Sequence, residues 1–147
     1  TYGVKGYYIV HPAEAQRALA QRIMGYWQEG FGAEYNPHRR EAFANVKLAR
    51  EIGEVEADIF AEQGKKPLKL ATDARPYPNT LDYATVRKKL ETEENPMLLL
   101  FGTGWGLVKE VIESCDIMLE PIYGPGEWNH LSVRSAAAII LDRLRGQ

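Results

Sequence analysis

Short apolar runs alternate with segments of helical spacing along almost the whole chain, and this alternation constrains the fold more than any other feature. Apolar, β-branched or aromatic residues dominate five runs: Lys5–Val10, Asn45–Ala49, Pro67–Ala71, Pro96–Phe101 and Asp116–Pro121. Runs of this length between helical patterns are typical of strands in βαβ units. The sequence therefore predicts an α/β fold with a mainly parallel sheet and helices on both faces.

The segments between these runs carry helical spacing. Pro12 stands at a helix-start position, and apolar residues then recur every three or four positions as far as Tyr26. Further helices are expected over Glu51–Gln63, after a cap at Asn79 or Thr80, over Leu107–Ser114 and over Ser132–Arg145. The last of these is apolar over much of its circumference, which predicts burial on more than one side. The segment from Gly25 to His38, rich in glycine and aromatic residues, is expected to form a long loop or lid.

The composition fits one ordinary globular domain. The 147 residues are 45% hydrophobic and 26% charged, and no linker or internal repeat divides them. The longest apolar run, Met97–Phe101, is far shorter than the roughly 20 residues that a membrane-spanning helix needs. Cys115 is the only cysteine, so an internal disulfide and a cysteine-based zinc site are excluded, and no metal is expected. These features predict a cytoplasmic protein.

A glycine-rich turn follows the fourth apolar run. Met97–Phe101 leads directly into Gly102-Thr103-Gly104-Trp105-Gly106, and a helical segment comes next. Glycines at such a turn let backbone amides approach a ligand, and the helix start presents free N–H groups. A tight turn without a ligand is the alternative. A dinucleotide-binding unit, or a Rossmann-like methyltransferase with Glu120 as its ribose-binding acid, would carry this loop near the start of the fold; here only residues 107–147 follow it.

The C-terminal segment carries the most specific pattern. Leu119-Glu120-Pro121-Ile122-Tyr123-Gly124 ends a strand with Pro, an apolar residue and Gly, and Asn129–Leu141 is a polar stretch that opens an Ala-rich helix. This pattern resembles the last motif of SPOUT methyltransferases, and the Gly102–Gly106 loop resembles the motif that precedes it. From Tyr7 to Arg145 the chain is similar to a bacterial family of RNA methyltransferases that depend on S-adenosyl-L-methionine (SAM). Members of that family are sometimes fused to, or encoded beside, tRNA guanine methyltransferases.

The resemblance implies an enzyme that transfers a methyl group from SAM to a tRNA or rRNA nucleotide. It also implies a C-terminal trefoil knot that forms the cofactor pocket, and a homodimer whose subunits share the substrate site. Family members usually begin with a further strand and helix. The chain is therefore expected to be a single SPOUT-like domain over residues 1–147 that lacks those elements, with a fused or adjacent tRNA methyltransferase as a possible partner.

The same resemblance implies a cofactor site made of loop backbone and small or apolar side chains. SAM carries no phosphate, so it is held by backbone hydrogen bonds to adenine, apolar walls, and polar groups on the ribose and carboxylate. Among these residues, His130 is expected to order the backbone rather than act as a base. The expected cofactor-binding residues are Thr72, Gly102, Thr103, Gly104, Leu119, Ile122, Gly124, His130, Leu131 and Ser132.

Two charged residues follow the third apolar run. Asp73 and Arg75 stand just after Ala71, at the position where open α/β sheets bind ligands. Asp73 is a candidate general base, and Arg75 a candidate for holding phosphate or lowering the pKa of an acceptor hydroxyl. A surface turn closed by Pro76 and Pro78 is the alternative.

An RNA-contact segment is expected where an aromatic residue, a turn and two arginines come together. The candidates are Tyr35, Asn36, Arg39 and Arg40, because Arg pairs with phosphate and stacks on bases. The alternative is a solvated helix start. The formal net charge of −2 indicates that any RNA is met by a local patch or a partner, since domains that bind nucleic acid by charge alone are usually basic.

A second function stays open beside the enzyme. The domain would then keep the SAM pocket but serve as a dimerisation or RNA-docking module for a tRNA-modifying enzyme. The acidic net charge favours this alternative. So does Asp73, which stands where the family more usually has a small hydroxyl residue.

Overall fold

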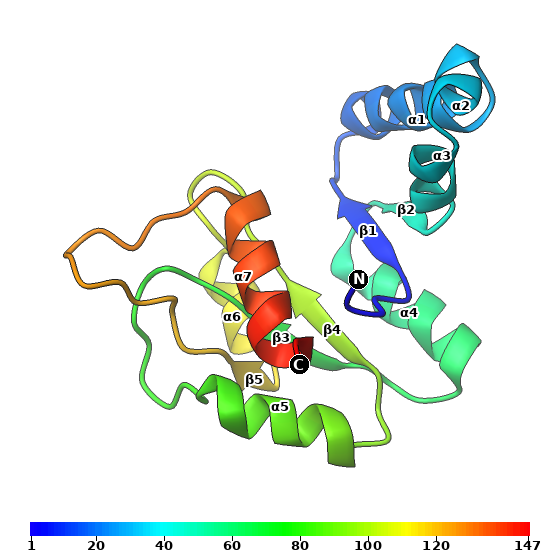
Figure 1. Ribbon diagram of the computed structural model, residues 1–147. Helices are drawn as coiled ribbons and strands as arrows, with labels where there is room; N and C mark the ends of the chain where they lie inside the picture. The colour runs from blue at the N-terminus through cyan, green and yellow to red at the C-terminus, as the bar shows by residue number, and fades with distance from the viewer. The chain divides into compact units, whose positions relative to one another are not determined.

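The computed structural model describes residues 1–147, and the chain divides into two compact units (Figure 1). The first unit comprises residues 3–62 with Thr1, and the second comprises residues 63–147 with Tyr2. All five strands expected from the sequence are present and all pair in parallel, but hydrogen bonds join them into two sheets rather than one. The prediction of a mixed α/β fold with parallel strands is therefore confirmed.

The first unit is built on two parallel strands joined by helices. Its elements are β1 (Tyr7–Val10), α1 (Glu14–Gln28), α2 (Phe31–Tyr35), α3 (Pro37–Phe43), β2 (Val46–Ala49) and α4 (Ile52–Gln63). A parallel pair needs a long crossover, which α1, α2 and α3 provide. The Tyr8 hydroxyl at 2.5 Å and the Lys47 amine at 2.7 Å both donate to Asp58 on α4, which ties this helix to the strands.

The segment expected to be a long loop or lid is largely helical, so that prediction is wrong. α1 continues to Gln28, and α2 and α3 follow at once. The signal for α3 is present in the sequence: Asn36 is its N-cap and accepts a hydrogen bond from the Arg39 N–H at 3.0 Å, with Pro37 in the first turn. An Asn cap followed by Pro favours helix initiation.

Close packing explains why glycine occupies position 32 in this segment. Gly32 is buried on α2. A Cβ at this position would lie 2.8 Å from the rings of both Tyr26 and Trp27. Gly32 is therefore required for close approach between α2 and the end of α1, and it does not mark a mobile loop.

The second unit contains a three-stranded parallel sheet whose central strand is β3. Its elements are β3 (Leu68–Ala71), α5 (Tyr83–Thr92), β4 (Met97–Leu100), α6 (Lys109–Glu113), β5 (Ile117–Met118) and α7 (Val133–Arg145). The strand order is β4-β3-β5, so the chain adds β4 on one side of β3 and then crosses to add β5 on the other. Ligands bind at such a reversal in open α/β sheets, outside the carboxyl ends of the strands.

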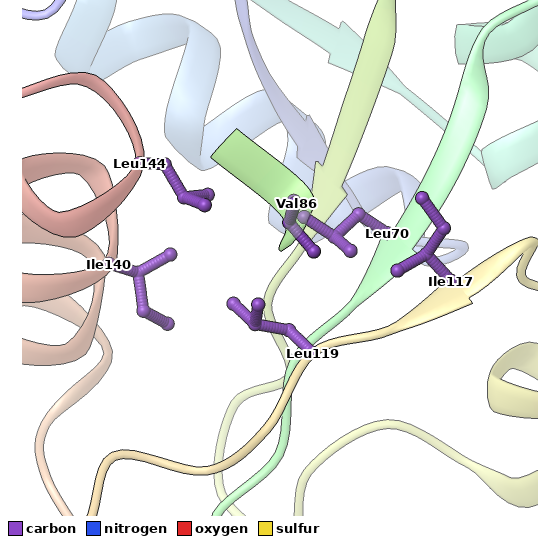
Figure 2. Packing of buried hydrophobic residues seen from close by; sticks show 6 residues of the cluster. All are labelled: Leu70, Val86, Ile117, Leu119, Ile140 and Leu144. Atoms are coloured by element: carbon purple, nitrogen blue, oxygen red, sulfur yellow. The ribbon is translucent and has the colours of Figure 1, made fainter. Parts of the chain in front are cut away.

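The hydrophobic core of the second unit lies between this sheet and the helices α5 and α7. Figure 2 shows the side chains of α7 pointing toward those of α5 and of the strand region. Leu70 and Leu119 are each 1% exposed, and Val86 is completely buried. The fully buried cluster is formed by Leu70, Val86, Ile117, Leu119, Ile140 and Leu144.

Helix α7 packs on the core of its own unit through one side. Ile140 and Leu144, four residues apart, are its two buried side chains. Arg134, Ala138 and Asp142 lie on exposed positions. Ile140 and Leu144 therefore belong to the core of the second unit, whereas Ile139 and Leu141 on the same helix are only half-buried.

Helix α5 begins later than expected, and its cap is a different residue. Neither Asn79 nor Thr80 is the cap; Asp82 is, and its carboxylate accepts from the Thr85 N–H at 2.7 Å. Asn79 instead has a positive φ of 61° in the turn before the helix, a conformation that Asn tolerates better than most residues. None of the helices is both long and apolar enough to cross a membrane.

Candidate cofactor cleft and active site

A cleft of about 470 Å³ opens in the second unit, where the chain leaves the carboxyl ends of β3, β4 and β5. Three segments supply its walls: the turn after β3, the glycine loop after β4, and the connection between β5 and α7 together with the start of α7. The lining residues are Thr72, Asp73, Ala74, Arg75, Phe101, Gly102, Gly104, Trp105, Gly106, Glu120, Ile122, Asn129, His130, Leu131, Ser132, Val133, Ala136 and Ile140. The cleft therefore lies at the point of strand-order reversal.

The glycine loop closes on itself in a tight turn. A Cβ at Gly102 would lie 2.3 Å from the Gly106 carbonyl carbon and 2.4 Å from the Leu107 nitrogen, so only glycine fits there. The Gly106 N–H donates to the Thr103 carbonyl at 3.2 Å. Gly104 and Gly106 have positive φ values of 60° and 88°. At its three glycines this wall of the cleft consists of backbone, and Trp105 is the one large side chain of the loop that lines it.

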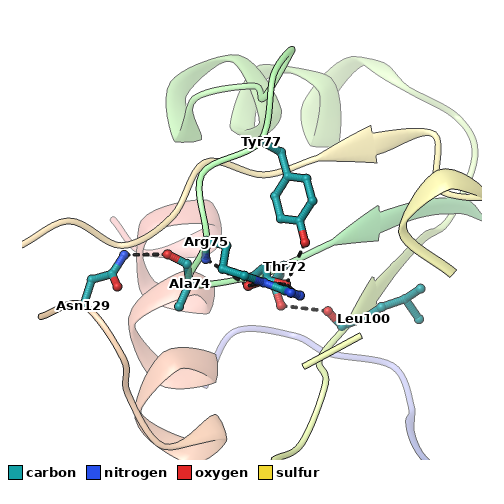
Figure 3. Close-up of polar contacts among 7 residues, drawn as sticks. Thr72, Ala74, Arg75, Tyr77, Leu100 and Asn129 are labelled. Carbon is teal, nitrogen blue, oxygen red and sulfur yellow. Dashed lines mark hydrogen bonds and ion pairs between the residues drawn. The ribbon is translucent and has the colours of Figure 1, made fainter. Parts of the chain in front are cut away.

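Two hydrogen bonds hold the three segments together (Figure 3). The Thr72 hydroxyl donates to the Leu100 carbonyl at 2.8 Å, which links the ends of β3 and β4. The Asn129 amide donates to the Ala74 carbonyl at 2.6 Å, which links the turn after β3 to the segment before α7. Both bonds fix loops that are distant in sequence around one cleft.

Asp73 and Arg75 form an ion pair on the turn after β3. The Arg75 Nη2 lies 2.6 Å from Asp73 Oδ2, its Nε lies 3.1 Å from Oδ1, and its backbone N–H donates to Oδ1 at 2.9 Å. The Tyr77 hydroxyl donates to Oδ2 at 3.3 Å. The Asp73 side chain is 6% exposed, whereas that of Arg75 is 53% exposed. The carboxylate is thus enclosed, and the guanidinium is held by it while still facing solvent.

The environment of Asp73 makes it a poor base. Burial alone would raise the pKa of the Asp73 carboxyl, but the side chain and backbone N–H of Arg75, with the Tyr77 hydroxyl, lower it overall. The same pairing raises the pKa of Arg75. A carboxylate stabilised by several donors takes up a proton reluctantly. This geometry suits Asp73 to orienting Arg75 and not to removing a proton.

We expect the ion pair to make stability depend on pH in the acid range. Because the folded pKa of Asp73 is lowered, its contribution is complete above the unfolded pKa of about 4 and is lost as pH falls through the folded value. The Asp73→Asn variant lacks this contribution. Thermal unfolding of both proteins between about pH 6 and pH 3 should show a gap in Tm that narrows on acidification. A gap that stays constant would contradict the pairing.

Nine of the twelve residues expected in the cofactor and catalytic sets line this cleft: Thr72, Asp73, Arg75, Gly102, Gly104, Ile122, His130, Leu131 and Ser132. Three do not. Leu119 belongs to the core, because its position at the end of β5 turns its side chain away from solvent. Thr103 lies in the exposed turn of the glycine loop, and Gly124 is exposed with open space around it.

The candidate RNA-contact residues all lie in the first unit. The Asn36 side chain is engaged as the cap of α3, and the Arg39 guanidinium stacks over the Trp27 ring at 4.2 Å. Tyr35 is 74% exposed and stacks on Phe31 at 6.0 Å. Arg40 is exposed in the last turn of α3. The sequence analysis gave a solvated helix start as the alternative to an RNA contact, and this alternative describes part of the segment.

Several residues that line the cleft were not in the expected set of cofactor-binding and catalytic residues. Trp105 and Gly106 belong to the glycine loop that the sequence had singled out. Glu120 had been considered only for a different fold, yet it lines the cleft, and its Oε1 lies 3.4 Å from the Tyr83 N–H. Asn129 also lines the cleft, and its hydrogen-bond partner is Ala74, 55 residues away. Only tertiary structure could reveal that bond.

A second hollow, of about 550 Å³, lies in the first unit beside α1 and the end of β2. Its charged groups are largely engaged already. Arg17 donates to the carbonyls of His11 and Pro12, both at 2.7 Å, and Arg50 lies 3.6 Å from Glu54. The cleft of the second unit is the better candidate site, because exposed Arg75 and the backbone of the glycine loop converge there.

The fold of the chain is that of known methylase structures. A probable methylase family protein from Haemophilus influenzae superposes with a TM-score of 0.57 at 16% identity, covering 95% of this chain and 64% of that one. A probable methyltransferase from Bordetella pertussis gives a TM-score of 0.59 at 17% identity, covering 98% and 80%. At this level of identity the similarity establishes the fold.

Sequence similarity identifies the family. Residues 1–146 match the family described as SAM-dependent RNA methyltransferase. The chain belongs to this family, which confirms the resemblance to SAM-dependent RNA methyltransferases drawn from its motifs and implies SAM as its cofactor.

Relatives of the chain fall into two groups by length. An uncharacterized protein of Aquifex aeolicus is 48% identical over 143 residues, which is 97% of this chain and 70% of that protein. Proteins named tRNA (guanine-N(1)-)-methyltransferase from Nitratidesulfovibrio vulgaris and Oleidesulfovibrio alaskensis are each 43% identical over 146 residues. The chain spans 34% of the length of each of these two relatives.

The residues of the cleft fit SAM. Its volume lies within the roughly 300–1,000 Å³ typical of small-molecule sites. Phe101, Ile122 and Leu131 provide apolar surface that suits an adenine ring, and the glycines of the loop expose backbone to the cleft. The Thr72 hydroxyl donates its proton to the Leu100 carbonyl, so only its acceptor capacity is left for the polar parts of the cofactor.

Proposed function

We propose that the cleft of the second unit binds SAM and that the chain methylates a nucleotide of tRNA beside it. The bound cofactor would supply an electrophilic methyl group on a sulfonium centre. The observation that carries the proposal is the convergence, at the strand-order reversal, of the glycine loop with Arg75 and the Asn129–Ser132 segment. This is the arrangement expected of a site that grips a nucleoside through backbone and positions an acceptor with a cation.

In this proposal the glycine loop and the apolar wall bind and orient the cofactor. Gly102 and Gly106 allow backbone to line the cleft directly, and Ile122 and Leu131 give one side of it an apolar surface. Asn129 acts as a positioning residue, since its bond to the Ala74 carbonyl keeps the two loops in register. Orientation matters because an in-line displacement is sensitive to misplacement of about 1 Å.

Arg75 is the residue that we assign to the acceptor. Its guanidinium is fixed by the Asp73 carboxylate yet remains 53% exposed beside the cleft. A fixed cation next to an acceptor base would stabilise the negative charge that forms as a ring N–H of that base loses its proton to solvent water. Asp73 holds the cation in place and is not the proton acceptor, because its lowered pKa disfavours that role.

We further propose the SPOUT architecture for the chain: a trefoil-knotted C-terminal segment and a homodimer. The support is the motif pattern of residues 119–141 and the membership of the family. The proposed dimer does not rest on Ile140 and Leu144 of α7, because both are buried within their own unit. Light scattering on the isolated chain tests the dimer directly.

One observation favours a second candidate function. The match covers only 34% of each relative named tRNA (guanine-N(1)-)-methyltransferase, so that activity could reside in the rest of those proteins. The present chain would then be a SAM-binding docking or dimerisation module for a tRNA-modifying enzyme. Its net charge of −2 fits a module that leaves most RNA contacts to a partner.

Methyl transfer from radiolabelled SAM into total tRNA and rRNA, followed by nucleoside analysis, distinguishes the two functions. We expect incorporation into a single modified nucleoside of tRNA and its loss in Arg75→Ala. The Phe60→Ala variant, which alters an exposed aromatic side chain of α4 in the first unit, should retain incorporation. SAM binding by calorimetry without any incorporation would overturn the enzyme proposal and support the module.

A further inference from the structure

Trp105 occupies an unusual position at the tip of the glycine loop. Its side chain is 100% exposed although it belongs to a loop that lines the cleft. A fully exposed Trp is rare, because this side chain is usually largely buried. The sequence thus places its largest side chain at the cleft without any intramolecular packing partner.

The backbone conformation of the loop fixes the position of Trp105 at its tip. Thr103 to Gly106 form a four-residue turn closed by the 3.2 Å hydrogen bond between the Gly106 N–H and the Thr103 carbonyl. Gly104 supplies the positive φ of 60° at the first central position, and Trp105 follows at the second with a negative φ. The base of the loop is fixed, since Gly102 contacts the Gly106 backbone too closely to admit a Cβ. Trp105 is therefore projected from a defined turn.

A cation lies beside the same turn. A Cβ built on Gly106, the residue after Trp105, would lie 3.4 Å from Arg75 Nη2 and 3.4 Å from Asp73 Oδ2. The half-exposed guanidinium thus lies beside the residue that follows Trp105 in the turn, and both Arg75 and Trp105 line the same cleft. An aromatic platform next to an arginine is the combination that RNA-binding sites use, with the base stacked on the ring and phosphate or base edges met by the guanidinium.

We propose that Trp105 stacks on an unpaired base of the RNA acceptor and so positions it at the cleft. This inference rests on the proposed function, since it assumes that the acceptor is delivered to this cleft. A base cannot reach a cofactor while it is paired within a helix, and stacking on an aromatic side chain stabilises the extruded form. Trp105 would accordingly act on acceptor binding and leave cofactor affinity unchanged.

Three variants test the proposal: Trp105→Ala, Trp105→Phe, which keeps an aromatic face, and Phe60→Ala as a matched exposed aromatic outside the cleft. We expect Trp105→Ala to lower kcat/KM for tRNA roughly tenfold, the order contributed by one base-stacking contact. Most of that loss should appear in KM. Trp105→Phe should recover most of it, and the dissociation constant of SAM measured by calorimetry should not change in any variant.

Binding of RNA to Trp105 can be measured without methyl transfer, so the role of Trp105 can be tested separately from the proposed methyltransferase function. In a Trp27→Phe, Trp128→Phe background Trp105 is the only tryptophan. Its fluorescence should be quenched by a single-stranded RNA oligonucleotide and much less by an abasic oligonucleotide of equal charge. If no variant or parent methylates RNA, the proposed function fails, and quenching alone decides the role of Trp105.

Other outcomes would overturn the inference. A parallel loss of SAM affinity in Trp105→Ala would mean that the indole contacts the cofactor. Conversion of a dimer into a monomer in that variant would mean that Trp105 is covered by a second copy of the chain. Equal kinetics and equal quenching by intact and abasic oligonucleotides would mean that Trp105 contacts no base.

Discussion

Substitution of Gly102 by alanine is expected to weaken SAM binding by at least about 100-fold. The added Cβ would fall 2.3 Å from the Gly106 carbonyl carbon and 2.4 Å from the Leu107 nitrogen. Both are backbone atoms, so a change of side-chain rotamer cannot relieve the clash, and the glycine loop must move out of the cleft wall. Displacement of binding groups by about 1 Å is enough for an effect of this size. Calorimetry with SAM measures it.

Two other glycines provide the comparison. Gly53→Ala, on α4 of the first unit, meets no atom within 4 Å and should bind SAM normally, with stability unchanged or raised by up to about 1 kcal/mol. Gly104→Ala also meets open space, but its φ of 60° strains an L-residue, so its effect should be intermediate. Gly102→Ala protein that is folded by circular dichroism and still binds SAM with parental affinity would falsify the assignment of this loop to the cofactor.

The strands and most helices could be predicted because the relevant signals are local. Each strand is a short apolar run, and each of the helices α1, α4, α5 and α7 repeats apolar residues at helical spacing. The segment from Gly25 to His38 was misread because glycine and aromatic residues there serve close packing, as at Gly32. The Asn36-Pro37 cap was a local signal that could have identified α3.

The site was predictable in outline but not in its contacts. Family motifs identified the loops, and the strand ends indicated Thr72, Asp73 and Arg75. Whether a side chain faces the cleft or the core depends on tertiary structure. Leu119 and Ile140 stand in neighbouring motif segments, yet Leu119 lies only in the core, whereas Ile140 lies in the core and also lines the cleft. The enclosure of Asp73 by its neighbours, which lowers its pKa and changes its proposed role, likewise has no sequence signal.

Substitution of Arg75 by alanine is expected to lower kcat for RNA methylation roughly 100-fold while leaving the dissociation constant of SAM within about twofold of the parent. A fixed cation that acts mainly in the transition state contributes effects of this size. Arg75→Lys should recover only part of the loss. The guanidinium holds Asp73 through both Nε and Nη2, and an ammonium group cannot reproduce that two-point contact.

Asp73→Asn distinguishes a positioning carboxylate from a base. If Asp73 orients Arg75, its replacement by an isosteric amide should loosen the guanidinium and lower kcat by roughly tenfold, less than the loss of Arg75 itself. The dependence of kcat on pH near neutrality should keep its shape, because the pKa of Asp73 lies below its usual range of about 4. If Asp73 were the base, Asp73→Asn would be at least as damaging as Arg75→Ala, and Arg75→Ala would shift the pH profile by releasing the Asp73 pKa upward. Single-turnover rates of the three proteins between about pH 5 and pH 9, at saturating SAM, separate the two roles, since both variants leave the glycine loop and the apolar wall of the cleft intact.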